Sequence, residues 1–98
     1  MEVILHPEVD SDLVDAMEYY SREASPELAV EFYSEFRRCA NLLERRANSF
    51  PFYVDQLRRL NFHRFPYHIL FEVISDELVQ IVTVKHDRRH PSYGIDRR

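Results

Sequence analysis

The sequence predicts an α+β domain in which a helical hairpin packs on one face of a small, mainly antiparallel sheet. Three observations support this fold class. Apolar residues recur at helical spacing in two consecutive segments of the first half, the second half alternates with a period of two, and a short apolar run opens the chain. The predicted order is β-α-α-β-β-β, in a single domain covering residues 1–98, because a chain of this length suits one core.

The opening run, "MEVIL" at residues 1–5, is predicted to be a strand that ends at His6 and Pro7. Proline is well tolerated in the first turn of a helix, so we predict a helix over residues 7–23. Its apolar stripe is formed by Val9, Leu13, Ala16, Met17 and Tyr20. The acids near its start suit the positive end of the helix dipole and are expected on a solvated face; they are Glu8, Asp10 and Asp12.

A second helix is predicted from an N-cap at Ser25, with Pro26 as its first residue, to about residue 47. Its apolar stripe is formed by Leu28, Phe32, Phe36, Cys39 and Leu43. The position of Cys39 within this stripe favours a small core residue over a nucleophile. Because only two or three residues separate the helices, they are expected to form an antiparallel hairpin.

The segment "NSFPFYVDQ", residues 48–56, breaks the helical period, and three strands are predicted after it, over residues 56–62, 67–75 and 78–86. Asp76 and Glu77 form a two-residue turn, which implies an antiparallel hairpin. The helices should cover one face of the sheet and leave the other at least partly open. The predicted packing places Phe32, Phe36 and Leu43 against Ile69, Phe71 and Val82.

The charge is divided unevenly along the chain. Residues 1–50 carry eleven acidic and five basic side chains, a balance of −6, whereas residues 51–98 carry six acidic and eight basic ones, a balance of +2. The net charge of −4 lies far from the strongly basic range of nucleic-acid-binding domains. The chain has no apolar run near the ~18 residues of a membrane span and only one cysteine, which favours a cytosolic protein.

The sequence holds no pattern for a metal or cofactor. One glycine cannot build a phosphate-binding loop, and there are no paired cysteines for zinc. His86 and His90 are four residues apart, a spacing that binds metal on a helix, but Pro91 and the preceding strand argue against a helix there. We therefore predict no metal site and no cofactor.

Basic residues cluster at two places in the second half and are the candidates for binding a target. They are Arg58, Arg59, Arg64, Lys85, Arg88 and Arg89, joined by His90. Neighbouring antiparallel strands would bring both clusters to one end of the sheet, beside His86 and Tyr93, where they could hold phosphates or contact a partner. The alternative, weighed equally, is that the arginines form ion pairs with the acidic helices.

The whole chain resembles a known family of proteins, and two segments carry the resemblance. "RRLNFHRFPYHILFEV", residues 58–73, is similar to the strand pair of the RelE/ParE superfamily of bacterial toxins, and "VKHDRRHPSY", residues 84–93, is similar to a ParE-type ending. The resemblance implies the toxin of a type II toxin–antitoxin module, also described as a plasmid stabilisation protein. It further implies a cognate antitoxin as partner, with a dimer or a heterotetramer as the assembly.

The superfamily contains two mechanisms. RelE-like members cleave mRNA on the ribosome, and ParE-like members poison DNA gyrase. The ribonuclease pattern has arginines where this chain has His68 and Asp87, and losing those cations would weaken stabilisation of a developing phosphorane. The resemblance is therefore nearer the ParE type. The second possibility is a ribosome-dependent mRNA endoribonuclease, in which His86 and Tyr93 would be catalytic. The third possibility is an inactive homologue that binds the antitoxin.

Overall fold

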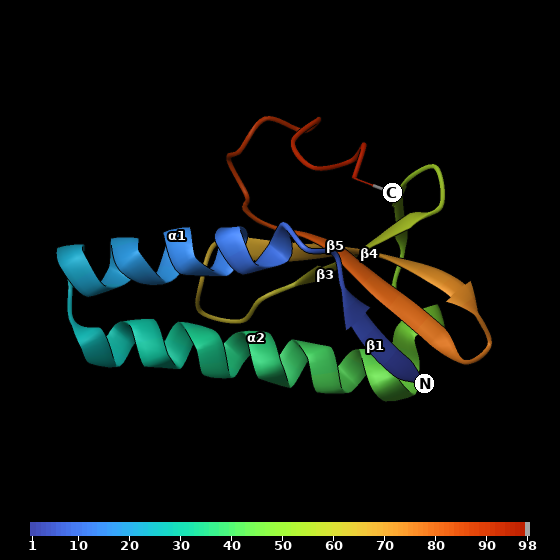
Figure 1. The fold of residues 1–98 in the computed structure, drawn as a ribbon, viewed down its shortest axis with the longest axis horizontal. Helices are drawn as coiled ribbons and strands as arrows, with labels where there is room; N and C mark the ends of the chain where they lie inside the picture. The colour runs from blue at the N-terminus through green and yellow to red at the C-terminus, as the bar shows by residue number, and fades with distance from the viewer. Residues whose placement is uncertain (98) are drawn as a thin grey trace.

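The computed structural model describes residues 1–97; Arg98, the last residue of the basic tail, lies outside the described residues. The elements follow the predicted order with two short additions, the 3₁₀ helix η1 and the strand β2 (Figure 1). They are β1 (Glu2–Leu5), α1 (Val9–Glu23), α2 (Pro26–Arg46), the 3₁₀ helix η1 (Ala47–Ser49), β2 (Phe52–Val54), β3 (Leu57–Asn61), β4 (Tyr67–Ser75) and β5 (Leu78–His86).

The two helices form the predicted antiparallel hairpin. The Ser25 side chain caps α2 by accepting a hydrogen bond from the Leu28 amide at 3.1 Å, as expected of an N-cap serine. The start of α1 differs from the prediction, because the helix begins at Val9 and not at Pro7. His6 closes a turn there: its Nδ1 accepts the Glu8 amide at 3.1 Å and its carbonyl accepts the Val9 amide at 2.9 Å.

The sheet has the strand order β1-β5-β4-β3-β2. Only β1 runs parallel to its neighbour, β5, and the other pairs are antiparallel, as predicted for a mainly antiparallel sheet. The turn at Asp76 and Glu77 places Ser75 opposite Leu78. The sequence pattern does not predict β2, because this strand has three residues and is too short to show a period of two. It also pairs with β3 through an irregular register.

The main core lies between the helices and the sheet. Phe32, Phe36 and Leu43 of α2 share one buried cluster with Ile69 and Phe71 of β4, which confirms that part of the predicted packing. Cys39 lies in the same cluster, and burial raises the pKa of its thiol to about 12, which suits a core residue and not a nucleophile.

The prediction for Val82 is wrong, because this side chain lies on the opposite face of the sheet with Leu57 and Leu70. A β-bulge is the reason. Leu70 pairs with Thr83 whereas Phe71 pairs with Ile81, so Val82 is an extra residue that interrupts the alternation of β5.

The face opposite the helices is partly covered by the chain after β5, which turns back over the sheet (Figure 1). Ile95 packs against the cluster of Leu57, Leu70 and Val82. Gly94, the only glycine, has φ +78°, and a Cβ at this position would lie 2.3 Å from Oγ1 of Thr83. A residue with a side chain would therefore force the tail away from the sheet.

Asp12 corrects the expectation that the acids of the first helix are solvated, because it is only 6% exposed. β1 pairs with β5 only as far as Ile81, so the Val84 amide beyond it lacks a strand partner on that side. The Asp12 carboxylate accepts this amide at 3.0 Å. It also accepts hydrogen bonds from the Tyr93 hydroxyl at 3.0 Å and from Arg97 at 2.6 and 3.1 Å, which ties the tail to α1.

Candidate target-contact surface

A basic loop follows β5 at the end of the sheet where β4 begins. It consists of residues 87–90, all of them exposed, and carries Arg88, Arg89 and His90. Its backbone is held by His86, whose Nδ1 accepts the Arg88 amide at 3.0 Å and whose carbonyl accepts the Arg89 amide at 2.9 Å. The loop therefore presents its cations from a turn and not from a helix.

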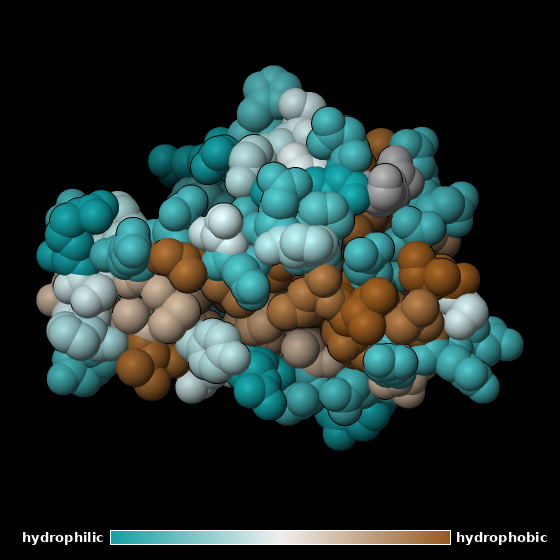
Figure 2. Space-filling view, in the orientation of Figure 1, coloured by the Kyte–Doolittle hydropathy of each residue, from teal (hydrophilic) through white to brown (hydrophobic). Residues whose placement is uncertain are grey.

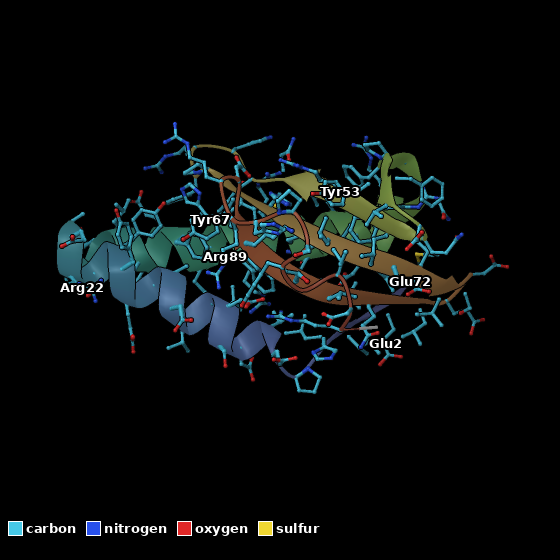
Figure 3. All side chains as sticks on the ribbon, turned by 90° about the horizontal axis from the view of Figure 1, so that it is seen from above. Glu2, Arg22, Tyr53, Tyr67, Glu72 and Arg89 are labelled. Carbon is cyan, nitrogen blue, oxygen red and sulfur yellow. The ribbon has the colours of Figure 1, made fainter. Side chains whose placement is uncertain are left out.

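Arg59 on β3 reaches the same place. One of its terminal nitrogens lies 3.5 Å from Oδ1 of Asp87, and its guanidinium is 5.8 Å from the centre of the Tyr53 ring. Arg89 stacks on Tyr93 with a separation of 3.9 Å. In Figure 3, Arg89 lies near Tyr67 at this end of the sheet, whereas Arg22 lies at the far tip of the helical hairpin. We call Arg59, Arg88, Arg89 and His90 the basic surface.

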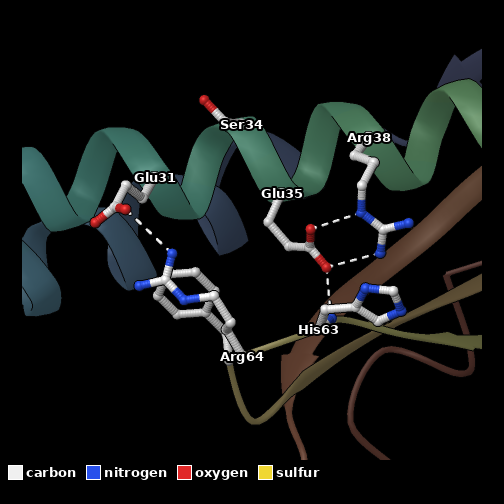
Figure 4. A pocket seen from close by; sticks show the side chains of 7 residues that line it. Glu31, Ser34, Glu35, Arg38, His63 and Arg64 are labelled. Atoms are coloured by element: carbon white, nitrogen blue, oxygen red, sulfur yellow. Dashed lines mark hydrogen bonds and ion pairs between the residues drawn. The ribbon is translucent and has the colours of Figure 1, made fainter.

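Two predicted members, Arg58 and Arg64, lie elsewhere and make structural contacts. Arg58 donates to the carbonyls of Asn48 at 3.2 Å and Phe50 at 2.7 Å, and it stacks on the Phe52 ring at 3.9 Å. Arg64 donates to Glu31 of α2 at 3.1 Å (Figure 4). Arg64 therefore forms an ion pair with an acidic helix, which is the alternative that the sequence left open.

Arg64 also borders a pocket of about 290 Å³ between α2 and the loop before β4 (Figure 4). Arg38 grips Glu35 there with two hydrogen bonds of 2.8 and 2.9 Å, and the His63 amide donates to the same carboxylate. Burial raises the pKa of Glu35, but the hydrogen bonds from Arg38 and His63 outweigh it and lower the pKa overall. Because the charged groups of this pocket pair with one another, we interpret it as a structural contact between α2 and the loop before β4.

Lys85 is also not part of the exposed surface, because it is 3% exposed. Its ammonium donates to the carbonyls of Pro91 at 2.9 Å and Tyr93 at 3.1 Å, with His90 at 3.5 Å. Burial lowers the pKa of Lys85, and the nearby charge of Arg59 lowers it further. The Lys85 side chain therefore holds the tail against the sheet.

The two candidate catalytic residues are both engaged in local structure. His86 is half-buried, with Nδ1 bonded to the Arg88 amide and its ring edge-on to Tyr67 at 5.2 Å. The Tyr93 hydroxyl donates to Asp12 and accepts from Arg97, each at 3.0 Å. Burial raises the pKa of Tyr93, and the charge of Asp12 raises it further. Tyr93 thus anchors the tail and supports Arg89.

The chain is similar to known proteins in sequence and in fold. The sequence model described as the ParE toxin of the type II toxin–antitoxin system parDE matches residues 3–91. The chain belongs to the ParE toxin family. Among solved structures, the fold is similar to a chain described as "Chromosomal ParDE TA system from P. aeruginosa", with a TM-score of 0.78 and 22% identity over 88% of this chain and 95% of that chain. No curated protein sequence matches it.

Two residues of this ParE-family protein that depart from the ribonuclease pattern are bonded to each other. Nδ1 of His68 lies 2.8 Å from Oδ1 of Asp87. His68 is 2% exposed and lies in β4 opposite Lys85, whereas Asp87 begins the basic loop. The sequence alone singled out both positions as departures but not as partners.

The neighbourhood of His68 predicts a pH effect on the stability of this ParE-family protein. Burial lowers the pKa of His68 from its ordinary value of 6.5; Asp87 opposes this shift, while Arg59 and Lys85 add to it. The unfolded chain therefore binds a proton at a higher pH than the folded chain. The contribution of His68 to stability is complete above about pH 6.5 and is lost as the pH falls through the lowered folded-state pKa.

We expect wild type to lose more stability than His68→Asn between pH 7.5 and pH 5, as measured by urea denaturation. Asparagine keeps a donor toward Asp87 but does not titrate. The two proteins differ only at residue 68, so the difference between their losses of stability isolates His68. Equal losses in the two proteins would contradict the prediction.

Proposed function

We propose that this ParE-family protein acts on DNA gyrase, which it binds through the basic surface, and that a cognate antitoxin neutralises it. Membership of the ParE toxin family supports a toxin role within a type II toxin–antitoxin system. The basic surface supports a binding role, because its loop cations are exposed on a chain that is otherwise acidic. Exposed cations on a defined loop favour fast and specific association with an acidic partner surface.

The position of Asp87 is the observation that favours binding over phosphodiester cleavage. Its carboxylate lies 2.8 Å from His68 and 3.5 Å from Arg59, at the point where the ribonuclease pattern would place a cation. A negative charge there would repel a scissile phosphate and the charge that develops on it during cleavage. Recognition of a protein surface has no such requirement.

Charge reversal in the loop tests the gyrase proposal. We expect the double variant Arg88→Glu and Arg89→Glu to bind purified gyrase roughly tenfold or more weakly, because attraction becomes repulsion at two adjacent positions. The matched control is the double variant Arg22→Glu and Arg45→Glu, which changes the net charge by the same amount at two exposed helix positions; Arg22 lies at the tip of the helical hairpin (Figure 3). Titration by calorimetry at two salt concentrations measures both affinities. Equal weakening by the control would mean that net charge, and not the basic surface, governs binding.

The antitoxin is proposed to occupy a groove between β1 and α2. β1 is an edge strand with one neighbour, and a pocket of about 280 Å³ lies beside it, lined by Leu5, Tyr33 and Phe36 among others. Ile4, Leu5 and Tyr33 are 36%, 41% and 40% exposed. Figure 2 shows the apolar side chains on this face as a belt across the middle of the molecule. An apolar groove beside a free strand edge suits either a docked helix or an added strand.

Co-expression with the antitoxin tests this groove. We expect a stable complex with wild type and a roughly tenfold or greater loss of affinity for Leu5→Glu, because a charge would be buried in the interface. Ile74→Glu is the matched control: Ile74 is also an exposed strand residue, 48% accessible, but it lies near the β4–β5 turn. If Leu5→Glu and Ile74→Glu co-purify with the antitoxin equally well, the groove is not the binding site.

A further inference from the structure

Asp87 is fixed from several directions although it begins an exposed loop. Its amide donates to the carbonyl of Pro66 at 2.8 Å. Its carboxylate oxygen Oδ1 is bonded to His68 on β4 and lies 3.5 Å from Arg59 on β3. The first residue of the basic loop is therefore held by the segment before β4 and by two strands.

We call the contacts that hold Asp87 the Asp87 anchor. His68 is its buried member, and burying this histidine destabilises the folded protein. An ionised carboxylate only accepts hydrogen bonds, so Nδ1 of His68 carries the proton and Nε2 has only a lone pair. Nε2 is buried and has no hydrogen-bond partner among residues 1–97. A buried acceptor without a partner is destabilising, and an apolar side chain would avoid that cost. Core stability alone therefore does not account for histidine at this position.

The conformation of the basic loop depends on the Asp87 anchor. The amides of Arg88 and Arg89 bond back to His86, directly before Asp87, and Arg89 then stacks on Tyr93. A shift of Asp87 would move both arginines relative to the sheet. The charged groups that face His68 are Asp87, Arg59 and Lys85. The neutral imidazole therefore lies among one anion and two cations.

We propose that His68 and Asp87 are a positioning pair that fixes the basic loop in the conformation in which Arg88 and Arg89 contact the target. This inference rests on the proposed function for the target, but the ordering of the loop can be measured without it. His68 acts through Asp87 and does not itself touch the target.

Two substitutions separate positioning from packing. His68→Leu removes the bond to Asp87 and also the unpaired Nε2, so the protein should be as stable as wild type or more stable, while its affinity for gyrase falls roughly tenfold. His68→Asn places an amide donor near the position of Nδ1 and should retain wild-type affinity within about threefold. A merely structural residue would lose stability and affinity together.

Amide hydrogen exchange of the free protein provides the readout that needs no target. In His68→Leu the Arg88 and Arg89 amides should exchange roughly tenfold faster or more, with core amides of β4 unchanged and His68→Asn close to wild type. Asp87→Ala should give the same loop exchange from an exposed position if His68→Leu does not fold. Failure of wild type to bind gyrase would sink the proposed function alone. Unchanged loop exchange in both His68→Leu and Asp87→Ala would overturn the positioning pair.

Discussion

Replacing Phe32 by alanine is expected to lower the free energy of unfolding by about 3–5 kcal/mol. Phe32 is fully buried, and its ring contacts Tyr20, Phe62, Phe65 and Tyr67 with centroid separations of 5.7, 5.3, 5.3 and 4.9 Å. Truncation removes the centre of this aromatic cluster and leaves a cavity between α2 and the start of β4. A domain of this size has roughly 5–10 kcal/mol of total stability, so the substitution is expected to remove a substantial part of it.

Tyr33→Ala is the matched control for Phe32→Ala. Tyr33 is the next residue of α2 and is 40% exposed, so its removal should cost about 1 kcal/mol or less. Urea denaturation monitored by circular dichroism measures both variants. Similar losses for the two substitutions would show that the cluster around Phe32 is not the centre of the core.

Replacing Asp12 by alanine should be comparably damaging, at about 3–5 kcal/mol. The Arg97 side chain is 7% exposed. Without Asp12 its guanidinium would be a buried charge that keeps, among residues 1–97, the Val82 carbonyl, the hydroxyl and ring of Tyr93, and the exposed carboxylate of Glu8. The Val84 amide and the Tyr93 hydroxyl would lose an acceptor as well. The tail should then separate from α1 and become sensitive to proteases.

Asp10→Ala controls for the helix dipole in this comparison. Asp10 lies in the same first turn of α1 but is exposed, so its loss should cost about 0.3–1 kcal/mol. Limited proteolysis of the tail, together with urea denaturation, distinguishes the two variants. A cost below about 1 kcal/mol for Asp12→Ala, or a tail that stays protected, would show that the buried ion pair does not anchor the tail.

The helices and the long strands could be predicted because local patterns determine them. The serine cap before Pro26, the apolar stripe of α2 and the two-residue turn at Asp76 depend on neighbouring residues alone. The bulge at Val82 could not be predicted in this way. It reverses which face the following residues occupy, and nothing in the sequence of β5 marks the inserted residue.

Asp12 and Lys85 were misjudged for a related reason. A carboxylate in the first turn of a helix and a lysine at the end of a strand both suggest solvent exposure. Each is buried because it binds backbone groups that no strand satisfies: the Val84 amide beyond the end of β1, and the carbonyls of the returning tail. Such partners depend on how far two distant segments extend, which local patterns do not reveal.

The His68 and Asp87 pair had a signal in the sequence that went unused. The turn at Asp76 and Glu77 places Ser75 opposite Leu78. Counting back along both strands places His68 opposite Lys85, because the two register shifts in this strand pair offset each other. Asp87 follows two residues after Lys85, so it falls beside His68 at the end of the sheet. Register counting from a tight turn would have brought the two departures from the ribonuclease pattern together.

We propose that the protein poisons gyrase and does not cut RNA, and one experiment tests both parts of this proposal. The purified protein is incubated with gyrase and supercoiled plasmid, and DNA breaks are measured. In parallel, it is added to a translating ribosome system, and the mRNA is mapped by primer extension. We expect gyrase-dependent breaks in the DNA, intact mRNA, and little change in either result for His86→Ala. Cuts at codon positions in the mRNA that vanish in His86→Ala, with gyrase unaffected, would contradict the account and establish a ribonuclease.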